Sequence, residues 1–185
     1  MFSITTLTPN EIISSKYQTK EWRQNQVWYQ NGKHQECERY QMSLLSQNWI
    51  HFPEMKKTNV RLNVYDYELR NIVNLKKENM FEWSENFDAI VRDKFLFNLK
   101  FICDQGGSQA RTMRETFHFI RAQISHLKIN KNYVFINILD GDFCYRHTKI
   151  FRSIIPDGLY SKLIFIGDLE QFIAWWNEYY ANDRQ

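Results

Sequence analysis

Three polar residues stand where an apolar strand is not expected to carry them. Asp88 follows Asn86-Phe87, and Asn98 and Lys100 interrupt the apolar run 95–102. Because residues 98 and 100 differ by two, their side chains leave the same face of a strand. Burying a lysine requires an opposite charge nearby, so Asp88 is its expected partner across a hairpin. Such a pair is either a structural ion pair at a sheet edge or part of a functional site.

A candidate anion site follows this strand in the sequence. Gly106 and Gly107 precede a predicted helix that begins near Ala110, with Ser108 as its N-cap. Helical spacing puts four basic side chains on one stripe: Arg111, Arg114, His118 and Arg121. A helix N-terminus, glycine-loop amides and arginines together bind anions. The alternative interpretation of the stripe is a solvated basic face.

The elements that must position these residues are predicted from periodicity. The stretch 85–121 reads as strand, turn, strand, glycine loop and helix, and the helix has a second, apolar stripe: Met113, Phe117, Ile120, Ile124 and Leu127. Residues 133–139 form an almost continuously apolar run, which predicts a central strand with a parallel neighbour. It ends at Asp140-Gly141-Asp142, where the carboxylates are either ligands or only turn residues.

The C-terminal part continues the same alternation. A strand is predicted over 162–166, and Asp168 with Gln171 forms a capping box for a last helix. That helix has a broad aromatic face, which favours core packing or a dimer contact: Phe172, Trp175, Trp176 and Tyr179. A right-handed crossover puts the 110–127 helix on one face of a small mixed sheet, with the last helix covering the sheet further out.

We therefore predict one α/β domain over residues 1–185, with three layers and a central mixed sheet flanked by helices. Residues 1–80 are predicted to be a mostly helical N-terminal segment, and 81–185 the α/β core. A helix is expected from Gln35 to Trp49, whereas 60–75 fits either a short strand or a helix. The Asp88, Asn98 and Lys100 face is expected to point to a groove between the sheet edge and the N-terminal segment.

Composition limits the class of protein. The 185 residues are 43% hydrophobic and 24% charged, as in ordinary globular proteins. A net charge of +3 excludes a generally basic nucleic-acid coat, so attraction to DNA must come from a local patch. The three cysteines are odd in number and unclustered, which favours a reducing, intracellular (cytoplasmic) setting over a disulfide framework or zinc site. No signal peptide or membrane span is expected.

The ordered set of motifs resembles a nuclease family. Asp88 followed by Asn98-Leu99-Lys100 is similar to the PD-(D/E)xK nuclease motif, and the wider run resembles type II restriction endonucleases. That run comprises 85–88, the 98–100 strand, 106–109, Arg111, Arg114-Glu115 and 138–142. The resemblance covers about the C-terminal hundred residues. It implies a restriction-endonuclease-like core, double-stranded DNA as substrate and Mg²⁺ as cofactor. Asn98 departs from the family, which has Asp or Glu there.

The resemblance also implies roles for individual residues. Asp88 would be the main Mg²⁺ ligand, Asn98 would offer a neutral carbonyl oxygen, and Lys100 would position or deprotonate the attacking water. Having one carboxylate fewer implies a need for high Mg²⁺, the use of Glu85 or Glu115, or loss of activity. Phosphates would be held by Gln109, Arg111, Arg114 and Arg121. Bases would be read from the N-terminal segment, where suitable side chains are Arg23, Asn25, Gln26, Gln30 and Lys33.

Two alternatives to a site-specific endonuclease remain open at the level of sequence. One is a catalytically inactive nuclease-fold protein that binds DNA or another partner. The other is an unrelated small α/β binding protein in which the Asp–Lys pair is structural. Cutting both strands of a palindrome would imply a homodimer by symmetry.

Overall fold

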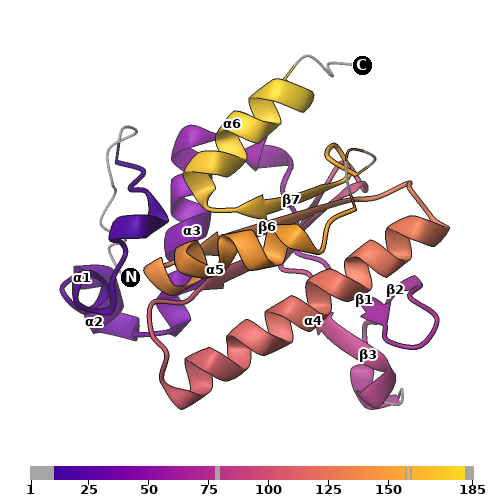
Figure 1. Ribbon diagram of the computed structural model, residues 1–185, viewed down its shortest axis with the longest axis horizontal. Coiled ribbons are helices and arrows are strands. Elements are labelled where there is room, and N and C mark those ends of the chain that lie inside the picture. The colour runs from indigo at the N-terminus through magenta and orange to yellow at the C-terminus, as the bar shows by residue number, and fades with distance from the viewer. Residues whose placement is uncertain (1–10, 78–79, 157, 159, 182–185) are drawn as a thin grey trace.

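The computed structural model describes residues 11–77, 80–156, 158 and 160–181, and Figure 1 shows how its elements are arranged. The strands are β1 (Val60–Asn63), β2 (Leu69–Asn71), β3 (Trp83–Asn86), β4 (Ala89–Val91), β5 (Phe95–Phe101), β6 (Val134–Asp140) and β7 (Ile164–Gly167). The α-helices are α1 (Lys20–Gln24), α2 (Val27–Gly32), α3 (Gln35–Asn48), α4 (Gly107–Ile129), α5 (Asp142–Ser153) and α6 (Leu169–Tyr179). Among the described residues no helix is both long and apolar enough to cross a membrane.

The central sheet has four strands in the order β4-β5-β6-β7. β4 pairs antiparallel with β5, whereas β5, β6 and β7 are parallel, so the sheet is mixed. The parallel neighbour predicted for residues 133–139 is confirmed on both sides. β6 is buried along its whole length, which explains why its sequence is apolar without alternation.

Helices cover both faces of this sheet. The β5-α4-β6 and β6-α5-β7 connections join adjacent parallel strands, and both helices pack on the face that carries Leu96 and Ile102. Helices α3 and α6 pack on the opposite face, against Phe97 and Leu99 (Figure 1). The predicted three-layer α/β arrangement around a mixed sheet is therefore confirmed. α6 lies on the face opposite α4, where its aromatic side chains Phe172 and Trp176 fill the core.

The N-terminal part is less helical than predicted. It is helical through α3 and a short 3-10 turn, and residues 60–71 then form strands of a second, three-stranded antiparallel sheet with the order β2-β1-β3. This small sheet packs against α4, through Leu62 in the shared core and a 2.7 Å contact between His126 Nδ1 and the Tyr67 carbonyl oxygen. These strands are only four and three residues long, which is too short for periodicity to separate strand from helix by sequence.

Helix α4 begins earlier than predicted. Its N-cap is Gly106, and Ser108 lies inside the first turn instead of capping the helix. Of the predicted apolar stripe, Met113, Ile120, Ile124 and Leu127 are buried, and Phe117 is partly buried against the same core. The capping box predicted at Asp168 and Gln171 is present in α6. Periodicity therefore located the core face of α4, whereas its first residue depended on the glycine loop.

Candidate functional site

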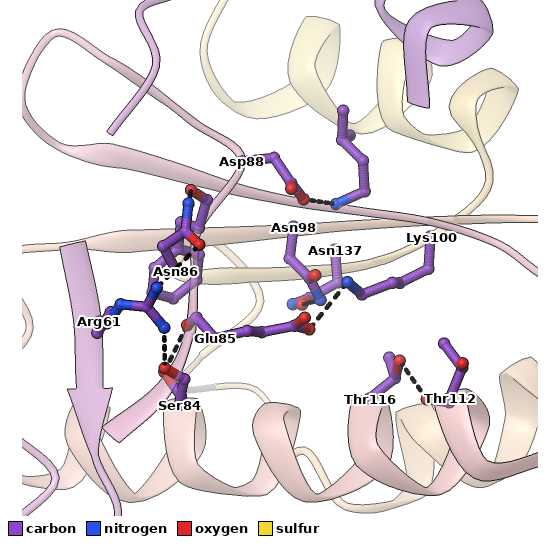
Figure 2. Close-up of polar contacts among 12 residues, drawn as sticks. Arg61, Ser84, Glu85, Asn86, Asp88, Asn98, Lys100, Thr112, Thr116 and Asn137 are labelled. Carbon is purple, nitrogen blue, oxygen red and sulfur yellow. Dashed lines mark hydrogen bonds and ion pairs between the residues drawn. The ribbon is translucent and has the colours of Figure 1, made fainter. Parts of the chain in front are cut away.

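Lys100 forms an ion pair with Glu85 of β3. The Lys100 Nζ lies 2.8 Å from Glu85 Oε1, and the side chains are 17% and 49% exposed. Figure 2 shows both side chains on the α4 side of β5, pointing toward each other. The predicted Asp88–Lys100 pairing is wrong as a direct contact. The pairing of β4 with β5 ends at Ala89 opposite Phe97, after which the Asp88 N–H still donates to the Phe97 carbonyl at 2.8 Å. Glu85 lies on the strand before β4 and reaches the lysine instead.

Asp88 binds the backbone of β5. Its Oδ2 accepts a hydrogen bond of 2.6 Å from the Leu99 N–H, beyond the point where β4 stops pairing. The carboxylate thus takes the place of a strand neighbour, and it points at the strand in Figure 2. Burial raises the pKa of Asp88 to about 6, although the Lys100 charge and the Leu99 amide lower it. The charge of Lys100 therefore acts on Asp88 without a direct ion pair.

Asn98 belongs to a buried amide network. Its Nδ2 donates to Asn137 Oδ1 at 2.9 Å, and Asn137 exchanges two further hydrogen bonds with Gln123 of α4, at 2.7 and 3.0 Å. The three side chains are at most 1% exposed. Asn98 and Asn137 are direct partners in the β5–β6 register. The Asn98 nitrogen is therefore used in this network, and the side-chain oxygen is the atom of Asn98 that could act as a metal ligand.

A groove opens beside the Glu85–Lys100 pair. It has a volume of about 310 Å³, lies between β3 and α4, and includes Glu85 and Glu115 among its lining residues. The groove was expected between the sheet edge and the N-terminal segment, facing Asp88, Asn98 and Lys100; this one lies between β3 and α4, and those three residues are not among its lining residues. Both glutamates that the sequence offered as substitutes for a missing carboxylate face this one groove.

The donors at this edge suit a hard cation in kind. Carboxylate and amide oxygens are the ligands that Mg²⁺ takes, and the ion commonly uses one or two carboxylates and fills its remaining positions with water and substrate phosphate. Asp88 and Glu85 supply two such carboxylates. Within the described residues, no group of three or more Asp, Glu, His or Cys side chains is close enough to form a complete protein cage. The donors present therefore match Mg²⁺ in chemical type only.

The predicted phosphate-binding residues lie on α4. Arg111, Arg114 and Arg121 are exposed along one ridge, and Arg111 makes an ion pair of 3.4 Å with Glu115. Ten residues of helix separate Arg111 from Arg121, which is about 15 Å. Gln109 is half-buried in the first turn, and its Oε1 is buried without a hydrogen-bond partner in the described part of the chain. The ridge is accessible to a polyanion, whereas Gln109 is only partly so.

One predicted base-reading residue is not accessible. Arg23 is 2% exposed, and its guanidinium lies 4.8 Å from the centre of the Tyr29 ring. The other four candidates keep exposed or half-exposed side chains: Asn25, Gln26, Gln30 and Lys33. Direct base contact by Arg23 is therefore wrong for this conformation, because aromatic residues of the N-terminal helices enclose it.

The carboxylates at the ends of β6 and β7 are tied to the chain itself. Asp140 Oδ2 accepts from Gln41 Nε2 at 2.8 Å and its Oδ1 from the Leu169 N–H at 3.2 Å. Asp168 Oδ2 accepts from the Ser15 hydroxyl at 2.8 Å. Burial raises the pKa of Asp140 to about 7. Asp140 was expected to be either a ligand or a turn residue, and these contacts favour a structural role.

Glu85 was expected only as a substitute for a missing carboxylate, and its pairing with Lys100 was not predicted. Its signal was its position in the 85–88 run, which precedes a strand lysine that needs a partner. In comparisons with known proteins, no family model, no curated protein and no solved structure matches the chain. Function must therefore be argued from the geometry of this edge of the sheet.

Proposed function

We propose that this protein is a Mg²⁺-dependent endonuclease that hydrolyses phosphodiester bonds of double-stranded DNA, as type II restriction endonucleases do. The observation that carries the proposal is the gathering of Glu85, Asp88 and Lys100 around the open end of the β4–β5 hairpin, beside a groove. The exposed arginine ridge of α4 supports a polyanionic substrate, because arginine matches phosphate geometry.

The residues divide the work as follows. Asp88 and Glu85 would hold Mg²⁺, with the Asn98 oxygen as a further donor. When bound, the ion supplies positive charge at the phosphate and lowers the pKa of water. Lys100, which forms an ion pair with Glu85, would orient the attacking water. Arg111, Arg114 and Arg121 neutralise and align the DNA backbone, which positions the substrate without reading its sequence.

Plasmid cleavage tests this proposal directly. Wild-type protein is expected to produce discrete fragments with Mg²⁺ and none with EDTA. Glu85→Gln, Asp88→Asn and Lys100→Met should each slow cleavage by on the order of 100-fold or more, as removal of a charge-stabilising group does elsewhere. Asp93→Asn is the matched control, since Asp93 is exposed at the other end of the same hairpin, with φ 51°, which Asn also tolerates. Equal cleavage by Asp88→Asn and wild type would rule out this site.

A second candidate function is a nuclease-fold protein that binds DNA without cutting it. The observation that favours it is that Asp88 Oδ2 already accepts from the Leu99 N–H, while the Nδ2 of Asn98 fixes this side chain in a buried network. A mobility shift with no product at any Mg²⁺ concentration would support this candidate over the first. Absence of both binding and cleavage would contradict the two together.

A further inference from the structure

The groove between β3 and α4 has one wall from each element. Its polar lining residues are Ser84 and Glu85 on the β3 side and Glu115 and His118 on the α4 side, between apolar side chains. Glu85 also contacts Lys100, so the groove leads directly to the candidate site. Two carboxylates in a small groove repel a phosphate. A substrate phosphate that enters the groove therefore needs a positive group in its wall.

His118 is the lining residue that can supply this charge. Its side chain is exposed, and it lies four residues after Arg114 and three before Arg121, which puts it in the middle of the arginine ridge. The charged and titratable groups that line this groove or the neighbouring α4–α5 groove with it are Glu85 of β3, Arg114 and Glu115 of α4, and His147 of α5. Arg121 follows His118 three residues later on α4, and Lys100 of β5 pairs with Glu85. The ridge and the groove therefore meet at His118.

We infer that His118 is a phosphate-binding residue, whose protonated imidazole donates an N–H to a backbone phosphate beside the bond that is cut. This inference rests on the proposed function and adds a residue to it. A DNA backbone that follows the ridge runs over about 15 Å of helix between Arg111 and Arg121, and His118 is where that path meets the groove. A charge-assisted N–H to a phosphate oxygen is among the stronger hydrogen bonds.

The test is DNA affinity, measured by fluorescence anisotropy with a labelled duplex in EDTA. His118→Gln should bind about three- to tenfold more weakly than wild type, as expected for one lost contact. His118→Lys should restore the affinity of wild type, because a lysine also donates charge-assisted hydrogen bonds to phosphate.

His147→Gln is the matched control. His147 lines the neighbouring α4–α5 groove, which His118 also borders, and its Nδ1 contacts the Phe143 carbonyl oxygen at 2.8 Å within its own helix. This variant should bind DNA like wild type. Unfolding midpoints of the two His118 variants should match that of wild type, because the side chain at position 118 is exposed.

The outcomes separate this inference from the nuclease proposal. If wild type cuts DNA but His118→Gln binds like His147→Gln, the inference about His118 is overturned and the nuclease proposal stands. If wild type binds without cutting and His118→Gln binds more weakly than His147→Gln, the nuclease proposal fails while the phosphate contact is supported. If wild type does not bind the duplex, both are overturned.

Discussion

Two regions of the central sheet carry carboxylates, and they differ in what satisfies them. At the ends of β6 and β7, Asp140 and Asp168 are 1% and 3% exposed, and donors from α3, α6 and the N-terminal segment occupy their oxygens. At the edge of β5, Glu85 remains 49% exposed and borders a groove. Both regions hold acids at the ends of strands, and only the second leaves oxygen atoms open to a ligand.

A position at the end of a strand therefore does not by itself distinguish a ligand-binding carboxylate from a structural one. The end of a parallel strand in an open α/β sheet is a common ligand position. Here the chain itself fills that position at β6. The β5 edge stays open because β4 is only three residues long and leaves the second half of β5 without a strand neighbour on that side.

The largest expected effect comes from removing the structural carboxylate. Asp140→Ala leaves the buried Leu169 N–H and one N–H of Gln41 Nε2 without an acceptor. The free energy of unfolding should therefore fall by about 3–5 kcal/mol. Urea denaturation measures it. Asp142→Ala, which removes an ion pair to Arg146 on a partly exposed side chain, should change it by about 1 kcal/mol or less. Equal losses would mean that the β6 end is no more structural than the surface.

Asp140 and Asp88 should both contribute to the pH dependence of stability, and Asp140 should contribute more. Burial raises the pKa of Asp140 from 3.8 to about 7 and that of Asp88 from 3.8 to about 6. The folded state then binds these protons more tightly than the unfolded chain, so stability is greatest below about pH 4 for these groups and falls as pH rises through their folded pKa values. Asp140 alone should contribute roughly 2–4 kcal/mol.

Urea midpoints measured from about pH 4 to about pH 8 check this direction. Asp140→Asn should show a shallower fall than wild type, because its side chain no longer titrates. A wild-type stability that rises steadily across this range would show that Asp140 is ionised in the folded state at lower pH than we expect.

Asn98→Asp tests whether Asn98 belongs to the accessible site at the β5 edge or to a buried structural network. The sequence alone predicted that this change would tighten Mg²⁺ binding. The buried network now predicts that a carboxylate beside Asn137 Oδ1 lowers the free energy of unfolding by about 2–3 kcal/mol, since a donor is lost and a charge is buried. Asn86→Asp is the control, because Asn86 is exposed at the end of β3. Unchanged stability with tighter Mg²⁺ binding would assign Asn98 to the metal site.

The smallest effect on stability is expected at the open edge. Glu85→Gln or Lys100→Met breaks an ion pair whose acid is about half exposed, so each should change the free energy of unfolding by about 1 kcal/mol or less. Cleavage should nevertheless be lost. A large destabilisation without any effect on DNA would make the Glu85–Lys100 pair structural, like Asp140.

Sequence by itself determined most of the local structure. Continuous apolar runs identified β5 and β6, the 3.6-residue period identified the buried face of α4, and the Asp168–Gln171 spacing identified the cap of α6. Each of these signals lies within one element, where period and capping chemistry act over a few residues. The same local logic put Asn98 and Lys100 on one face of one strand, as observed.

Tertiary structure decided the partners of those residues. Lys100 pairs with Glu85 because the fold brings the end of β3 next to β5. Asn98 contacts Asn137 because β5 and β6, which are joined by the crossover helix α4, are aligned in parallel register. Residues 98 and 137 are joined by neither periodicity nor spacing in the chain, since register is set by the packing of whole elements. Which carboxylate is enclosed and which faces a groove follows from that packing, and no pattern of neighbouring residues encodes it.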